Sequence, residues 1–140
     1  KIKKSNKKYY VVCGDGEINE GSIWESLLSA SKHNLNNLVV LIDYNKLQSY
    51  APINEVLELE PLNKKFKSFN FNVLEVNGHD IIQIDEAIKL ANKNLTKPTV
   101  IICHTIKGKG IKVAENNPSW HHKSFLTDKD LKDIESSLGK

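Results

Sequence analysis

Tyr9-Tyr10-Val11-Val12-Cys13-Gly14-Asp15-Gly16 joins an apolar run to a carboxylate between two glycines, and Leu38-Val39-Val40-Leu41-Ile42-Asp43-Tyr44-Asn45 repeats the pattern with an amide. Between Gly16 and Asn45 lie 28 residues, enough for one crossover helix and a return strand. The two runs are typical of neighbouring parallel strands, whose carboxyl ends share one edge of a sheet. We therefore expect Asp15 and Asn45 to lie close together.

These loop residues suit a divalent cation that carries a diphosphate. Mg²⁺ takes six oxygens and is usually held by few protein groups plus substrate phosphates. Asp15 supplies a carboxylate, Asn45 a side-chain carbonyl, and the backbone carbonyl of Leu47 can reach a third position. The glycine-rich loop and the N-terminus of the next helix favour anions. Lys107, in Lys107-Gly108-Lys109-Gly110, can add a cation to the same pocket.

Taken alone, Gly14-Asp15-Gly16 is also typical of a turn that binds nothing. The second half of the pattern, Asp43-Tyr44-Asn45 after an apolar run at the right distance, favours a metal–diphosphate site.

Alternating strand and helix patterns predict the fold. Four apolar runs indicate buried parallel strands, at residues 9–13, 38–43, 73–76 and 99–103. Helical patterns cover residues 22–35, 61–69, 80–95 and 128–138. This order predicts an α/β fold with an open parallel sheet, right-handed crossovers and helices on both faces. Such sheets bind ligands outside the carboxyl ends of their strands.

Local signals place the helix starts. Ser22 and Glu25 resemble a capping box, Pro61 suits the first turn of the second helix, and Asp80 is expected to cap the third. The third helix is expected to bury one face, made of Ile81, Ile84, Ala87, Ile88 and Ala91.

Length and composition limit the number of domains, the kinds of partner and the compartment. The 140 residues predict one domain, 1–140, which we expect to be N-terminally incomplete because the sequence begins almost directly at a strand. Five of the first eight residues are lysines, and without them the chain has 15 basic and 17 acidic residues. A nucleic-acid partner is therefore not expected. Cys13 and Cys103 are expected to be small core residues. No apolar run approaches the roughly 20 residues that a membrane span needs, and without a leader the expected compartment is the cytoplasm.

Several motifs together resemble the transketolase family. They are Gly14-Asp15-Gly16-Glu17-Ile18-Asn19-Glu20-Gly21-Ser22-Ile23-Trp24-Glu25-Ser26, Leu35-Asn36-Asn37-Leu38, Asp43-Tyr44-Asn45-Lys46-Leu47-Gln48, Gly78-His79-Asp80, Lys107-Gly108-Lys109-Gly110 and Trp120-His121. The likeness covers nearly the whole chain and is greatest to the diphosphate-binding domain, particularly the N-terminal subunit of split two-chain transketolases. One departure is His122, where the family usually has Gly.

The resemblance implies a role for each matching residue. Mg²⁺ would be ligated by Asp15, Asn45 and the carbonyl of Leu47. The cofactor, thiamine diphosphate, would be held by Gly14, Asp15, Gly16, Glu17, Glu25, Asn45, Lys107 and His121. The catalytic set would be His121, Glu20 and Glu25, of which His121 contacts sugar hydroxyls and the two glutamates link the cofactors of a dimer.

Each of these roles has a simpler alternative. Glu25 can be only the capping-box partner of Ser22, and Glu20 can simply favour the helix dipole. His121 and His122 can form a solvent-exposed pair.

The resemblance also implies an activity and partners. The enzyme would transfer a two-carbon ketol unit between sugar phosphates, in the pentose phosphate pathway. It would be active only with a pyrimidine-binding domain or C-terminal subunit, as a homodimer or heterotetramer. Two alternatives stay open: another thiamine-dependent enzyme, such as a 2-oxo acid dehydrogenase component or deoxyxylulose-phosphate synthase, and a non-catalytic assembly subunit.

Overall fold

The computed structural model describes residues 7–49 and 51–139. In chain order its elements are β1 (Tyr9–Gly14), the 3₁₀ turn η1 (Glu17–Asn19), α1 (Gly21–Lys32), β2 (Leu38–Tyr44), β3 (Leu47–Gln48), β4 (Ala51–Pro52), α2 (Ile53–Val56), α3 (Leu62–Ser68), β5 (Asn72–Asn77), α4 (Ile81–Lys93), β6 (Thr99–His104), the 3₁₀ turn η2 (Pro118–Trp120) and α5 (Asp128–Ser137). The four predicted strands are confirmed to within one residue at each end. Lys1, Lys3 and Lys4 of the basic segment lie outside the described residues.

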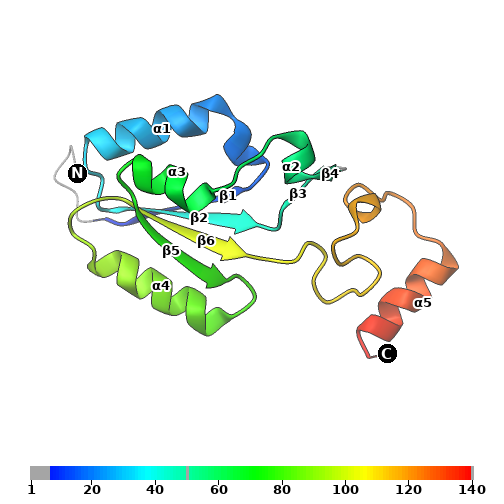
Figure 1. Ribbon diagram of the computed structural model, residues 1–140. Coiled ribbons are helices and arrows are strands. Elements are labelled where there is room, and N and C mark those ends of the chain that lie inside the picture. Colours follow the sequence, from blue (N-terminus) through cyan, green and yellow to red (C-terminus); the bar gives the residue numbers. More distant parts are fainter. Residues whose placement is uncertain (1–6, 50, 140) are drawn as a thin grey trace.

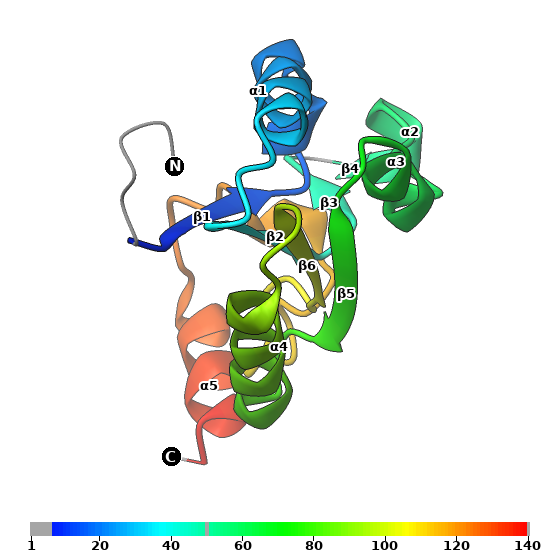
Figure 2. The same ribbon diagram turned by 90° about the vertical axis from the view of Figure 1, so that its left-hand side faces the viewer.

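The main sheet is parallel throughout and has the order β1-β2-β6-β5. Helices α1 and α3 cover one face and α4 covers the other, while α5 lies beyond the carboxyl ends of the strands (Figures 1 and 2). The predicted open parallel sheet with helices on both faces is confirmed. β3 and β4 form a small antiparallel pair beside it.

Successive side chains of the central strands point to opposite faces of the sheet, so the core consists of two clusters. Val40 and Ile42 of β2 pack with Leu27 of α1 and Phe66 of α3, among others. The α4-side cluster is smaller and contains Val39, Ala87, Ala91, Ile101 and Cys103. Cys13 and Cys103 are both buried, as expected.

Strand β1 departs from the prediction that all four strands are buried. Its residues Tyr9 to Val12 are 43–70% exposed, and Cys13 alone is buried. Among the described strands β1 pairs only with β2, and the α4-side cluster draws on β2, β5 and β6 but not on β1. The described helices therefore cover little of the β1 face that carries Tyr10 and Val12, although the Tyr10 hydroxyl donates to the Asn92 side chain of α4 at 2.9 Å.

Two helix starts also differ from the predictions. Glu20 is the N-cap of α1 and no side chain of the described residues caps this end, so Ser22 lies inside the helix and the predicted capping box is wrong. Pro61 is the N-cap of α3 rather than part of its first turn. The capping box forms instead at α5, between Thr127 and Asp130.

The predicted cap of α4 is confirmed, because the Asp80 side chain accepts hydrogen bonds from the N–H groups of Ile82 and Gln83. Ile81 is 81% exposed, so its predicted place in the buried face is wrong. Helix α1 ends three residues before the predicted end. Asn34 has φ 46° there, and the N–H groups of Asn34 and Leu35 bond back to the carbonyls of Ser31 and Ala30. No described helix combines the length and apolar character needed to cross a membrane.

Candidate functional site

The residues expected to form a metal site converge at the carboxyl edge of the sheet. Gly14 is the register partner of Asp43, and the N–H of Asp15 donates to the Asp43 carbonyl at 3.2 Å. Asp15 and Asn45 therefore each follow the end of one of two adjacent parallel strands. Their side chains are buried, with 3% and 9% exposure. The predicted convergence of these two residues is confirmed.

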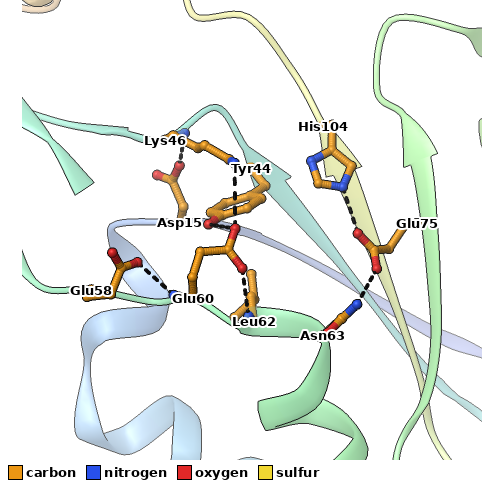
Figure 3. Close-up of polar contacts among 9 residues, drawn as sticks. All are labelled: Asp15, Tyr44, Lys46, Glu58, Glu60, Leu62, Asn63, Glu75 and His104. Atoms are coloured by element: carbon orange, nitrogen blue, oxygen red, sulfur yellow. Dashed lines mark hydrogen bonds and ion pairs between the residues drawn. The ribbon is translucent and has the colours of Figure 1, made fainter. Parts of the chain in front are cut away.

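Backbone N–H groups hold the Asp15 carboxylate in place. Its Oδ1 accepts from the N–H of Gly16 at 2.8 Å. Its Oδ2 accepts from the N–H of Lys46 at 2.6 Å, the contact that Figure 3 shows. Burial raises the pKa of Asp15, the two N–H donors oppose that rise, and the nearby Asp43 carboxylate adds to it. Buried negative charge of this kind is stabilised by a cation.

Asn45 shapes the loop that follows β2. Its Oδ1 accepts from the N–H of Leu47 at 3.0 Å, an Asx-type turn that directs the chain into β3. Gln48, the next residue, approaches Gly16 so closely that a Cβ there would lie 3.0 Å from the Gln48 Cγ. The glycine at position 16 thus lets the two loops meet.

A polar pocket of about 310 Å³ lies between these loops and the segment after β6. Its lining residues are Gly14, Asp15, Gly16, Glu17, Asp43, Asn45, Leu47, Gln48, Ser49, Lys107 and His121. Sequence reasoning missed three of them as site residues: Asp43, Gln48 and Ser49. Asp43 could have been predicted. A parallel register that brings the two strand ends together also pairs Asp43 with Gly14.

A second cavity, of about 330 Å³, adjoins the first and shares Asp43, Asn45 and Lys107 with it. Its remaining walls are mainly apolar and come from β1, β2, β6, the loop at Gly78, α4 and the segment after β6. The carboxyl edge of the sheet thus offers a polar hollow next to an apolar one.

Lys107 and His121 reach the polar pocket from the long segment after β6. Gly108 has φ +78° and packs against the Ala114 backbone, and the Lys107 carbonyl accepts from the N–H of Asn116 at 2.9 Å. The buried Nδ1 of His121 has no hydrogen-bond partner among the described residues. Burial lowers the pKa of His121, and the charges of Lys107 and His122 lower it further. His121 therefore lines this pocket as a neutral imidazole, with a buried polar atom that has no partner among the described residues.

Of the three glutamates in η1 and at the start of α1, one lies at the polar pocket and two lie away from it. Glu17 lines the pocket and its Oε2 accepts from the N–H of Gly14 at 3.2 Å. Glu20 and Glu25 are exposed and do not line it. Any role of these two residues at a cofactor would involve a second chain or segment, and it stays a prediction.

The donor set fits a hard cation that takes most of its ligands elsewhere. Within the described residues no group of three or more His, Cys, Asp or Glu side chains is arranged to hold a metal. The pocket instead places the Asp15 carboxylate and the Asn45 amide oxygen at adjacent strand ends, with the carboxylates of Glu17 and Asp43, the Gln48 amide, backbone carbonyls and the cation of Lys107 around them. This sparse oxygen set suits Mg²⁺ that is completed by phosphate oxygens and water.

A parallel sheet with a polar pocket at the carboxyl ends of its strands defines an α/β domain that binds its ligand at that edge. Residues 2–140 match the family described as "Transketolase, thiamine diphosphate binding domain". The chain belongs to this family.

Known proteins agree with this assignment. An apulose-4-phosphate transketolase subunit of Actinobacillus succinogenes is 42% identical over 119 residues, which are 85% of this chain and 43% of that protein. The 6-deoxy-6-sulfo-D-fructose transketolase subunit SqwG of Clostridium sp. is 37% identical over 113 residues, or 81% of this chain and 41% of that protein. The crystal structure of transketolase from Campylobacter jejuni superposes with a TM-score of 0.80 at 29% identity, covering 96% of this chain and 21% of that one. This chain thus spans about two fifths of the two subunits and a fifth of the transketolase.

Proposed function

We propose that this chain is the Mg²⁺- and diphosphate-binding part of a transketolase, in the N-terminal subunit of a two-chain enzyme. The observation that carries the proposal is the pair of buried side chains, Asp15 and Asn45, at adjacent strand ends around one polar pocket. The two subunit relatives support the two-chain arrangement, because each is named as one subunit of a transketolase.

The residues assigned to the metal and the diphosphate have separate tasks in this proposal. The Asp15 carboxylate, the Asn45 amide oxygen and the Leu47 carbonyl hold Mg²⁺, and Gly14, Gly16 and Glu17 form the loop beside the diphosphate. Lys107 neutralises part of the diphosphate charge from the opposite wall. When bound, thiamine diphosphate supplies the carbanion stabilisation that two-carbon transfer between sugar phosphates requires.

His121 is proposed to contact the sugar. Its lowered pKa keeps the imidazole neutral near pH 7, so that it can both donate and accept a hydrogen bond. The unpartnered Nδ1 supports this role, because a buried polar atom without a partner gains free energy when a ligand hydroxyl reaches it.

The partner is proposed to be a pyrimidine-binding chain, in a homodimer or heterotetramer. Exposed Glu20 and Glu25 at the start of α1 are available to such a chain. The substrates are proposed to be sugar phosphates. The two subunit relatives are named for different sugars, so the choice of sugar is assigned to residues outside the shared pocket.

Calorimetric titration of the full-length protein and its partner with thiamine diphosphate, at saturating Mg²⁺, tests the proposal. Asp15→Asn should weaken binding by at least about 100-fold, because it removes the only carboxylate assigned to the metal. Asp85→Asn is the control, since Asp85 is an exposed α4 residue that pairs with Lys89. Equal affinity in the wild type and Asp15→Asn would contradict the metal assignment.

A further inference from the structure

The carboxylate of Glu60 contacts the loop after β2, which carries Asn45 and Lys46. Glu60, just before α3, accepts a hydrogen bond from the Tyr44 hydroxyl at 2.8 Å with Oε1 and from the N–H of Leu62 at 3.0 Å with Oε2. The Nζ of Lys46 lies 3.5 Å from Oε1. Figure 3 shows Glu60 between the end of β2 and the start of α3. Glu60 therefore ties the two residues that flank Asn45 to helix α3.

Lys46 joins this network to the metal site. Its backbone N–H is the 2.6 Å donor to Asp15, and its carbonyl accepts from the N–H of Ile53 at 2.8 Å. Lys46 has φ 64°, a left-handed conformation that costs free energy for any residue other than glycine. Such a conformation persists only where surrounding contacts fix it. The Lys46 side chain is fixed by Glu60 and by the Tyr44 ring, whose centroid lies 5.2 Å from the Nζ.

Glu60 is charged under working conditions. The N–H of Leu62 lowers the pKa of Glu60, and Tyr44 and Lys46 lower it further, although partial burial opposes them. Tyr44 is 2% exposed, so its hydroxyl cannot turn to solvent and depends on the Glu60 oxygen.

Glu75 makes a parallel set of contacts that does not reach the metal loop. Its Oε1 accepts from the Asn63 amide of α3 at 2.7 Å, and its Oε2 lies 2.9 Å from the His104 Nε2 at the end of β6. The two glutamates are similarly exposed, at 48% and 41% of their side chains. Both join α3 to a strand end, as Figure 3 shows, but only the partners of Glu60 flank Asn45. Glu75 is thus a matched comparison within the same molecule.

We infer that Glu60 is a positioning residue for the proposed Mg²⁺ site: it holds Lys46 in its left-handed conformation, with the Lys46 N–H on Asp15. This inference rests on the proposed function for its consequence, metal affinity, but not for its structural content. Without Glu60 the loop would sample other conformations, and the Asp15 and Asn45 oxygens would spend less time in the geometry that a near-octahedral ion requires.

The test compares Glu60→Ala with Glu75→Ala in the full-length protein with its partner. The first readout is amide hydrogen exchange of the segment containing Lys46, without ligand. It should be at least fivefold faster in Glu60→Ala and unchanged in Glu75→Ala. The second readout is the Mg²⁺ concentration that half-saturates thiamine diphosphate binding. It should rise about fivefold to tenfold in Glu60→Ala only.

A second variant, Lys46→Met, keeps the Glu60 bonds to Tyr44 and Leu62 but removes the ion pair. It should shift both readouts in the same direction by a smaller factor. Equal changes in the two glutamate variants would show a general loosening of α3 and overturn the inference, as would wild-type exchange in Glu60→Ala. If wild-type protein failed to bind thiamine diphosphate with Mg²⁺, the proposed function would fail while the exchange comparison still decided the role of Glu60.

Discussion

The two walls of the polar pocket are built in different ways. One wall comes from the ends of β1 and β2, where strand register and backbone hydrogen bonds fix buried Asp15 and Asn45. The other comes from residues 105–127, where one 3₁₀ turn is the regular structure and Lys107 and His121 are half-buried. The strand-end wall is therefore preorganised by register and backbone hydrogen bonds, whereas the loop wall depends on local turns. Substitutions should therefore act on binding geometry in the first wall and on loop order in the second.

After Asp15→Asn, the largest effect is expected from Asn45→Ala, in the same strand-end wall. Asn45 is the proposed amide ligand of Mg²⁺ and also accepts from the N–H of Leu47, so the substitution removes a ligand and loosens the turn. Thiamine diphosphate affinity should fall about 100-fold, which is about 2.7 kcal/mol. Calorimetry at fixed Mg²⁺ measures it. Asn92 lies on α4, and Asn92→Ala, which removes its contact with Tyr10 of β1, should leave the affinity unchanged. A loss below threefold in Asn45→Ala would show that the strand ends do not hold the ion.

The next effect is expected in the loop wall, from Gly108→Ala. A Cβ at Gly108 would collide with the Ala114 carbonyl, and the φ of +78° is unfavourable for alanine. Strain of about 2 kcal/mol would loosen the loop and lower cofactor affinity roughly 30-fold. Hydrogen exchange of residues 107–121 should rise in parallel.

Gly110→Ala separates collision from backbone strain. Gly110 has φ +98° but no atom within 4 Å of an added Cβ. Its effect should therefore be smaller than that of Gly108→Ala. If the two variants behaved alike, contact between Gly108 and Ala114 would have no part in ordering the loop wall.

Removal of the loop-wall charge should have a smaller effect still. Lys107→Met keeps the length of the side chain but removes one charge-assisted contact with the diphosphate, worth about 1.5 kcal/mol or roughly tenfold in affinity. The salt dependence of binding should also decrease. Lys109→Met is the control from the same loop, because Lys109 pairs with Glu115 and does not line the pocket. Similar losses in both variants would indicate a diffuse charge effect instead of a contact.

The strand-end wall was predictable from sequence for a physical reason. Parallel strands align their carboxyl ends, so two residues that each follow an apolar run must meet if the runs are neighbours. Asp15 and Asn45 satisfy that condition, and their convergence needed no side-chain detail. Their roles as ligands stay predictions.

Features that depend on lateral packing were not predictable. The apolar runs of β1 and β6 look alike, yet β6 is buried from Thr99 to Cys103 and β1 is exposed from Tyr9 to Val12. β1 is exposed because it is the edge strand and because α4 lies over the other three strands, and periodicity reports neither position. Glu60 was missed for a similar reason. It belongs to an irregular segment, and its partner Tyr44 is 16 residues away.

The smallest effect is expected in the pH dependence of the unfolding temperature. It tests the charge of the Asp15 carboxylate in the strand-end wall. Burial raises the pKa of Asp15 above its ordinary value, so the folded protein binds this proton more tightly than the unfolded chain does. The stabilisation from Asp15 is therefore complete below the unfolded pKa and is lost as pH rises through the folded pKa. Above that pH the ligand-free protein carries a buried carboxylate whose cost of burial is only partly offset by its N–H donors. Asp15→Asn should accordingly raise the unfolding temperature at pH 7.5, by an amount on the order of 2 °C, and should not raise it at pH 4.

Asp130, which lies outside the pocket, has a pKa shift opposite in sign to that of Asp15. Its bonds with Lys123 and Thr127 lower the pKa of Asp130 to about 2. Its stabilisation is present above the unfolded pKa and is lost as pH falls through the folded one, so Asp130→Asn should lower the unfolding temperature at pH 7.5. Thermal unfolding of both variants from pH 4 to 7.5, without Mg²⁺ or cofactor, gives the two signs directly. If Asp15→Asn were destabilising at pH 7.5 as well, the Gly16 and Lys46 N–H bonds would already compensate the charge. The strand-end wall would then need no cation for its stability.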